Sequence, residues 1–254
     1  MFLGIFTRRD DIANRILIRQ TSFQTIVPPV VTAKFLICHP RSSVSDLTLW
    51  AELQDYDDLY FIDCTENMDN GKTLTYLSRV RHDFPGFAYY AKMDTDSYVL
   101  YHNLAFALAS APRCRLYAGR SNYPFFDSNS RYMSGSLYIL SADLVQYFER
   151  CGPPCVGVDG VEDMQVGEFV QSFVQDDFYF AGLGSNSSIL YHLDDSQTEP
   201  RSLTVYVHDV KSHEKWWKTH EHVCKALTLH GLGLATNHSY FEGGQTRQWE
   251  GECV

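Results

Sequence analysis

Two aspartates, separated by one residue, follow a largely apolar segment near the middle of the chain. Asp94 and Asp96 come directly after the run from Phe87 to Met93. Side chains at positions i and i+2 of an extended chain point to the same side, so both carboxylates can face one hard cation. Because Mg²⁺ or Mn²⁺ held by one or two carboxylates keeps positions for phosphate oxygens, the pair predicts a metal site for a nucleotide diphosphate. The alternative is ordinary turn chemistry with solvated charge.

A second acidic pair and a histidine lie further along the chain. Glu162 and Asp163 stand at the start of a predicted helix that runs to Phe173. Taken alone, this pair indicates only negative charge that stabilises a helix N-terminus. His208 lies in a short predicted strand that begins at Val205, where an isolated histidine is usually a packed or exposed side chain.

The composition limits the class of protein. With 254 residues, 44% of them hydrophobic, the chain can bury a large core, and we expect one large α/β domain. A formal net charge of -10 argues against a nucleic-acid partner, because phosphate backbones require clustered Lys and Arg. No apolar run reaches the roughly 20 residues that cross a bilayer, so we expect a soluble chain with no membrane contact.

The seven cysteines allow disulfides without requiring them. Cys38 and Cys64 end predicted buried strands, where we expect them to act as small apolar core residues. Cys151 and Cys155 flank a Gly-Pro-Pro turn, which is compatible with a small disulfide or with two free thiols. Together with the glycosylation patterns at Asn186 and Asn237, this indicates a lumenal protein.

Apolar periodicity predicts alternating strands and helices. The predicted strands are 2–6, 33–38, 59–63, 87–92, 115–119, 135–140 and 205–211, and the predicted helices are 12–22, 44–53, 71–80, 99–110, 142–150 and 163–173. This alternation is typical of a parallel, doubly wound sheet flanked by helices. We expect a functional loop at 122–131, a catalytic domain over 1–215, and a C-terminal extension over 216–254 that is partly helical or disordered.

Five motifs, in this order, resemble those of the family 31 β-1,3-glycosyltransferases, the galactosyltransferase/Fringe group, and most of all its fungal branch. They are Arg15-x-x-x-Arg19-x-Thr21; Asn67-x-x-x-Gly71-Lys72-Thr73; Lys92-x-Asp94-Thr95-Asp96; Tyr132-x-x-Gly135-x-x-Tyr138-x-x-Ser141; and Glu162-Asp163-x-x-x-Gly167. The chain departs from the family at Thr95, where the family has a third acid between the two aspartates.

The resemblance implies a GT-A fold, an inverting reaction, a UDP-sugar donor and Mn²⁺ or Mg²⁺. It implies that Asp163 is the catalytic base and that Asp96 and His208 are metal ligands. It implies that Asp94 holds the ribose or a water on the metal. Two basic residues, Arg19 and Lys72, are implied as uridine or diphosphate contacts, although Arg19 can equally lie on a solvated helix face.

The resemblance also implies a galactose or N-acetylglucosamine donor, a β-1,3 linkage, and an acceptor glycan on a glycoprotein or glycolipid. The aromatic residues Phe125, Phe126 and Tyr132 can floor an acceptor site, because sugar rings stack on aromatic faces, or can pack in the core. The family resides in the Golgi behind a membrane anchor. We therefore expect either that this sequence begins after the anchor or that the protein is located elsewhere.

Two other function classes remain open from the sequence. A degenerate transferase fold that binds nucleotide or glycan without transfer is compatible with the missing middle acid. A metal-dependent phosphohydrolase would use Asp94 and Asp96, but such sites usually draw on more carboxylates and histidines than this chain offers.

Overall fold

Strands and helices alternate through the first 110 residues, as the apolar spacing predicts. The structure is a computed structural model, and it describes residues 1–26, 29–39, 47–121, 132–151, 160–174, 179–182, 190–192 and 205–229. The predicted loop at 122–131, with Phe125 and Phe126, lies outside these residues. So do Cys155, Asn186, Asn237 and the chain beyond 229.

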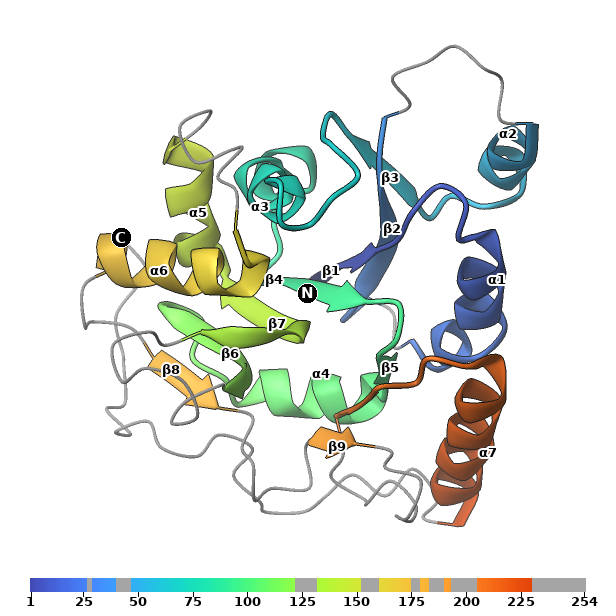
Figure 1. Cartoon of the computed structure of the whole chain (residues 1–254). Helices are drawn as coiled ribbons and strands as arrows, with labels where there is room; N and C mark the ends of the chain where they lie inside the picture. Colours follow the sequence, from blue (N-terminus) through green and yellow to red (C-terminus); the bar gives the residue numbers. More distant parts are fainter. Residues whose placement is uncertain are drawn as a thin grey trace.

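Figure 1 shows the arrangement of the elements. The strands are β1 (Phe2–Phe6), β2 (Thr32–Cys38), β3 (Leu59–Ile62), β4 (Tyr89–Asp94), β5 (Tyr98–Val99), β6 (Leu116–Ser121), β7 (Met133–Ser141), β8 (Tyr179–Gly182), β9 (Leu190–His192) and β10 (Tyr206–His208). The helices are α1 (Ile12–Gln20), the short 3₁₀ helix η1 (Ser22–Thr25), α2 (Leu47–Asp55), α3 (Lys72–Asp83), α4 (Tyr101–Ala109), α5 (Ala142–Cys151), α6 (Glu162–Val174) and α7 (His213–Leu229).

The main sheet has seven strands in the order β3-β2-β1-β4-β7-β6-β8. Strands β1 to β4 pair in parallel, and so do β6 and β8. Strand β7 runs antiparallel to both of its neighbours, β4 and β6. The predicted α/β class, with a mostly parallel sheet flanked by helices, is confirmed, and β7 is the antiparallel member of that sheet.

Strand alternation divides the core into two layers, one on each face of the sheet. Leu3 and Ile5 of β1 face the layer formed with α1, α4 and α7, whereas Phe2 and Phe6 face α3, α5 and α6. Gly4 lies where α3 approaches β1 closely. An added Cβ there would lie 2.7 Å from the Tyr76 ring, whose hydroxyl donates to the Ala91 carbonyl across 2.8 Å. Glycine therefore allows α3 to pack directly on the strands that carry the polar residues described below.

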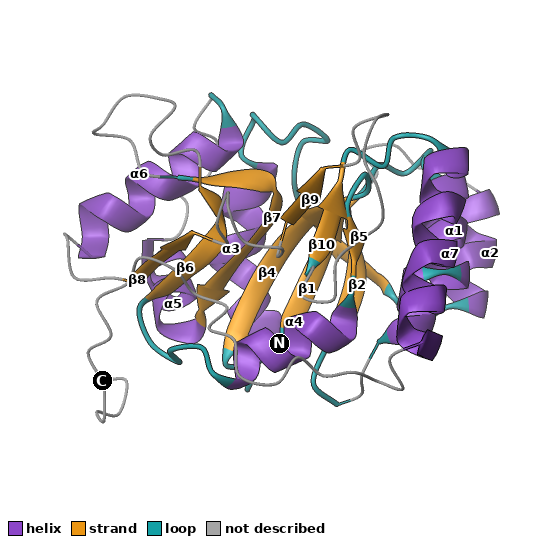
Figure 2. Ribbon diagram, turned by 90° about the horizontal axis from the view of Figure 1, so that it is seen from below, coloured by secondary structure: helices purple, strands orange, loops and turns teal. Residues whose placement is uncertain are grey.

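A small second sheet, in the order β5-β10-β9, joins the C-terminal part of the chain to the first half. After it, helix α7 contacts α1, because His213 Nε2 lies 3.2 Å from Asn14 Oδ1, and Figure 2 shows both helices at the same end of the sheet. The Trp216 side chain of α7 is buried, and its Nε1 donates to Thr21 Oγ1 across 2.6 Å. In the part of the chain that the structure describes, no helix combines the length and apolarity needed to cross a membrane.

Candidate active site

A hollow of about 360 Å³ lies where β1, β3 and β4 end. It is lined by residues after β1 (with Phe6 at the strand end), residues after β3, the first residue of α3, and residues at the end of β4: Phe6, Thr7, Arg8, Asp11, Glu66, Asn67, Met68, Lys72, Asp94, Thr95 and Asp96. The carboxyl ends of parallel strands meet at one edge, which is where open α/β sheets bind ligands. The structure therefore brings together three predicted site residues: Asp94, Asp96 and Lys72.

The two aspartates of the motif differ in their surroundings. Asp94 Oδ1 lies 2.9 Å from the buried Nζ of Lys92. Asp94 Oδ1 and Asp96 Oδ1 are both buried and accept no hydrogen bond from the described residues, but the Lys92 ammonium compensates the charge of Asp94, whereas Asp96 faces His208. A buried carboxylate oxygen without a donor is costly unless a cation satisfies it. Asp96 is therefore the better placed of the two to bind a metal ion directly.

Strand β10 brings His208 to Asp96. It pairs antiparallel with β5, so that Val207 lies opposite Tyr98, and the Val210 N–H donates to the Asp96 carbonyl across 2.9 Å. His208 Nε2 then lies 3.8 Å from Asp96 Oδ1. Burial raises the pKa of Asp96 and lowers that of His208, while the attraction between the two opposes both shifts. The neutral imidazole is the form that ligates metals.

The donors present fit a divalent ion that keeps open positions. Within the described residues, no group of three or more His, Cys, Asp or Glu side chains is arranged around a common point. Asp96 Oδ1 and His208 Nε2 are a pair of donors that lie 3.8 Å apart. An oxygen and an imidazole nitrogen suit Mn²⁺, with the other positions available to phosphate oxygens and water.

Glu162 and Asp163, at the start of α6, point to different partners. Glu162 is buried, lies 2.9 Å from Lys92 Nζ and accepts a hydrogen bond from the Thr73 hydroxyl. Asp163 is half-buried, and its Oδ2 accepts the Gly135 N–H across 3.2 Å. Burial raises the pKa of Asp163, opposed by that N–H and by the charge of Lys92. Asp163 is thus the more accessible acid of the pair.

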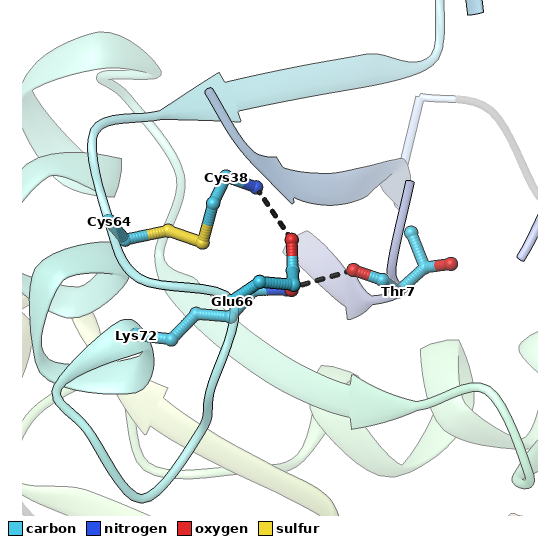
Figure 3. The surroundings of a disulfide bond; sticks show 5 residues. All are labelled: Thr7, Cys38, Cys64, Glu66 and Lys72. Atoms are coloured by element: carbon cyan, nitrogen blue, oxygen red, sulfur yellow. Dashed lines mark hydrogen bonds and ion pairs between the residues drawn. A yellow bond between two sulfur atoms is a disulfide. The ribbon is translucent and has the colours of Figure 1, made fainter. Parts of the chain in front are cut away.

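Lys72 lines the hollow with a buried side chain, and Figure 3 shows it beside Glu66 and Thr7. Its Nζ donates to the Thr7 carbonyl across 2.8 Å and forms an ion pair with Glu66. Burial lowers the pKa of Lys72, and the ion pair with Glu66 opposes this shift. Lys72, predicted to contact the uridine or the diphosphate, therefore lies at the hollow, but its ammonium group is already bound to Glu66 and to the Thr7 carbonyl.

The same wall contains a disulfide that the sequence did not indicate. Cys38 and Cys64 are bonded, and the Cys38 N–H donates to Glu66 Oε2 across 3.2 Å. Cys38 is buried and Cys64 packs against the core, as predicted, but they are not separate thiols, because the parallel pairing of β2 with β3 brings their ends together. Cys151 is also disulfide-bonded, as is Cys114.

Arg19 does not line the hollow. Its guanidinium is buried and pairs with Asp58 at 2.6 Å and with Glu52 at 2.7 Å. It also lies 3.9 Å from the centre of the Tyr56 ring. Arg19 therefore lies neither on a solvated helix face nor beside the hollow, the two locations considered for it. Tyr132, predicted to line an acceptor site or the core, is buried.

Sequence reasoning assigned no role to two residues that organise this region, Lys92 and Glu66. Both lie within or beside the quoted motifs, and that is the only signal that could have found them. A lysine inside an apolar strand is unusual, since lysine is almost never fully buried unless it is paired.

Residues 13–119 match the Galactosyltransferase family model. The match includes Lys72, Asp94 and Asp96 and ends before Asp163 and His208. It bears out the predicted enzyme class, a glycosyltransferase, and does not distinguish the fungal branch from others. No curated protein sequence matches the chain.

Several solved glycosyltransferases have a similar course of the chain. The galactosyltransferase LgtC, in complex with donor and acceptor sugar analogs, is 10% identical with a TM-score of 0.48, over 87% of this chain and 95% of that one. The mannosyltransferase PcManGT from Pyrobaculum calidifontis, in complex with GDP-Man and Mn²⁺, is 14% identical with a TM-score of 0.46, over 94% and 66%. Mouse xyloside xylosyltransferase 1 is 9% identical with a TM-score of 0.45, over 82% and 96%. Similarities at this level concern the path of the backbone alone and carry no information about substrate or mechanism.

Proposed function

We propose that this chain transfers a hexose, of the galactose or N-acetylglucosamine class, from a UDP-sugar to a hydroxyl of a glycan acceptor. The observation that carries the proposal is the meeting of Asp96 and His208 beside a hollow that also contains Asp94 and Lys72. The match of residues 13–119 to the Galactosyltransferase model supports the reaction class.

Asp96 and His208 are the residues that would hold Mn²⁺ or Mg²⁺. When bound, such an ion neutralises the charge that develops on the departing diphosphate. Asp94 Oδ1 already forms an ion pair with the Lys92 ammonium, so we assign Asp94 the role of accepting a hydrogen bond from the ribose. Arg19 has no part in this proposal because Glu52 and Asp58 hold its guanidinium.

The charges that line the hollow support dependence on a metal ion. Among the described residues that line it are four carboxylates, those of Asp11, Glu66, Asp94 and Asp96, and two cationic side chains, Arg8 and Lys72. A bare diphosphate is repelled by such a surface, because opposite charges within about 4–6 Å attract and like charges repel. The hollow therefore favours a diphosphate that arrives with a divalent cation.

Asp163 is the proposed general base. In one in-line displacement, the acceptor oxygen forms a bond to the anomeric carbon while the bond from that carbon to the diphosphate oxygen breaks, and Asp163 takes the hydroxyl proton. A single displacement inverts the anomeric centre. Glu162 is the less suitable base, because it is buried and its carboxylate is paired with Lys92.

The remaining features of the proposal are a β-1,3 linkage, a glycan acceptor on a glycoprotein or glycolipid, and the Golgi lumen as the compartment. The Cys38–Cys64 disulfide supports an oxidising compartment, since disulfides are rare in reducing ones.

The test is a panel of UDP-sugars assayed with and without Mn²⁺, scored for binding, donor hydrolysis and transfer to simple glycosides. We expect Mn²⁺-dependent binding of UDP and slow hydrolysis of one or two donors. Mn²⁺-dependent binding of UDP with no turnover of any donor would instead indicate a module that binds nucleotide without transfer. No binding of UDP in either condition would exclude both functions.

A further inference from the structure

Lys92 lies in the centre of β4, with its side chain buried between three elements. The side chain is 1% exposed. Its Nζ lies 2.9 Å from Asp94 Oδ1 and 2.9 Å from Glu162 Oε1, and it donates to the Gly135 carbonyl across 2.8 Å. These three partners come from the end of β4, from β7 and from the start of α6.

Gly135 is the part of β7 that lets the ammonium reach both acids. A Cβ at this position would lie 2.8 Å from Lys92 Nζ and 2.9 Å from Glu162 Oε1. The same residue contacts the proposed base, because its N–H donates to Asp163 Oδ2 across 3.2 Å. One glycine therefore accepts from Lys92 on its carbonyl side and donates to Asp163 on its amide side.

A charge arrangement of this kind fixes geometry. Removing one partner of a buried ion pair costs much more than an exposed pair is worth, because a charge is left without compensation. Here one ammonium serves two buried or half-buried carboxylates, and Thr73 of α3 holds the other oxygen of Glu162. Asp94 and the first turn of α6 cannot separate without breaking these contacts.

We propose that Lys92 is a positioning residue that holds Asp94, on the donor side, at a fixed separation from Asp163, on the acceptor side, through Gly135 and Glu162. Glu162 is in this view the second anchor of Lys92 and not a base. The inference rests on the proposed function, because it assigns the distance between the nucleotide site and the base to this one ammonium.

The test compares Lys92→Met, Glu162→Gln and the double variant Lys92→Met/Glu162→Gln, with Lys34→Met as the matched control. Lys34 is a lysine of β2 that pairs with the exposed Asp57 and is not among the residues lining the hollow. Each protein is measured for melting temperature, Mn²⁺-dependent UDP affinity, and kcat and KM for the donor.

Lys92→Met should lower kcat on the order of 100-fold, the cost of misplacing reacting groups by about 1 Å. KM for the donor should change much less than kcat. The double variant removes the uncompensated charge of Glu162, so its melting temperature should recover relative to Lys92→Met while its kcat stays low. A double variant with the kcat of the wild type would overturn the inference, because Lys92 would then serve stability alone.

Glu162→Gln keeps the inference testable if Lys92→Met does not fold. If Glu162 is an anchor, this variant should have a reduced kcat with the same acidic limb in the pH–rate profile as the wild type. Loss of that limb would make Glu162 the base and overturn the inference, as would an unchanged kcat. A wild type that binds UDP but transfers nothing overturns the proposed function and this inference with it, whereas an active wild type with unaffected variants overturns this inference alone.

Discussion

At the scale of single residues, neighbouring acids have different surroundings. Asp94 is paired with the Lys92 ammonium, whereas Asp96 faces His208. Glu162 is buried in an ion pair, whereas Asp163 is half-buried beside Gly135. In each pair, the acid that is not paired with Lys92 is the one to which we assign a role in the reaction: Asp96 as a metal ligand and Asp163 as the base.

Replacing Asp163 with Asn tests its assignment as the base. The amide retains the shape and can still accept the Gly135 N–H, but it cannot take a proton from the acceptor. Loss of a general base lowers the rate by about 100- to 10,000-fold, so we expect transfer to fall by that factor while UDP-sugar affinity persists. The assay pairs donor affinity with transfer rate on the folded variant. Transfer close to that of the wild type, with only a lower melting temperature, would reduce Asp163 to a charge at a helix N-terminus.

Removing Asp96 or His208 tests the metal pair. Asp96→Ala should abolish Mn²⁺-dependent UDP binding, because a ligand and a neutralising charge are lost together. His208→Ala should weaken Mn²⁺ binding less, since a neutral ligand carries no charge. Calorimetry with Mn²⁺ and UDP measures both effects. Asp57→Asn, which removes a fully exposed acid, is the control and should bind as the wild type does. Normal binding by either test variant would remove that residue from the site.

At the scale of elements, the loop between β3 and α3 forms one wall of the hollow and is held at several points. The disulfide joins its beginning to β2, and Glu66 connects the Cys38 amide to Lys72 at the start of α3 (Figure 3). The β5–β10 pairing has a comparable role near Asp96, because it places His208 there.

The double variant Cys38→Ala/Cys64→Ala should lower the free energy of unfolding by about 3 kcal/mol, the amount typical of a closed loop of this size. The two cysteines are 26 residues apart in the sequence. Urea unfolding measures the change, and Cys224→Ser, which replaces an exposed thiol that is in no disulfide, is the control and should change stability much less. Equal midpoints for the double variant and the wild type would show that the ion pair holds this wall without the disulfide.

Trp216 tests how firmly α7 is attached to the rest of the fold. Its side chain is buried against the Tyr98 ring and donates to Thr21. Trp216→Ala should cost about 3–5 kcal/mol, as large-to-small changes of buried aromatic residues do. Its neighbour Trp217 is 44% exposed, so Trp217→Ala is the matched control and should cost much less. Equal thermal shifts for the two variants would contradict a buried role for Trp216.

At the scale of the whole molecule, the protein is acidic and its hollow is acidic as well. The formal net charge is -10, and the hollow carries more carboxylates than cations. Long-range attraction for a nucleotide diphosphate is therefore absent, and affinity must come from short-range contacts and a cation.

UDP should therefore stabilise the protein only when Mn²⁺ is present. A ligand at 100 times its Kd stabilises the folded state by about 2.7 kcal/mol, which is readily seen as a higher melting temperature. With a chelator in place of Mn²⁺, we expect no shift with UDP. A shift of the same size in both conditions would show that Lys72 and Arg8 bind the diphosphate without a metal ion.

The sequence by itself determined the alternation of strands and helices and the α/β class, because these depend on apolar spacing within short segments. It also placed Asp94 and Asp96 at the end of a strand. The family resemblance supplied Asp163 and His208 as candidates, and the structure brings His208 to within 3.8 Å of Asp96.

Only the tertiary structure decided which distant residues meet. The reversal of β7, the Cys38–Cys64 bond and the ion pairs of Lys92 each depend on which strand lies next to which. Arg19 belongs to the same group, because its acidic partners lie more than 30 residues away in sequence. Patterns within a short segment predict its secondary structure. Pairing between distant segments depends on how the whole core packs, so no short motif predicts it.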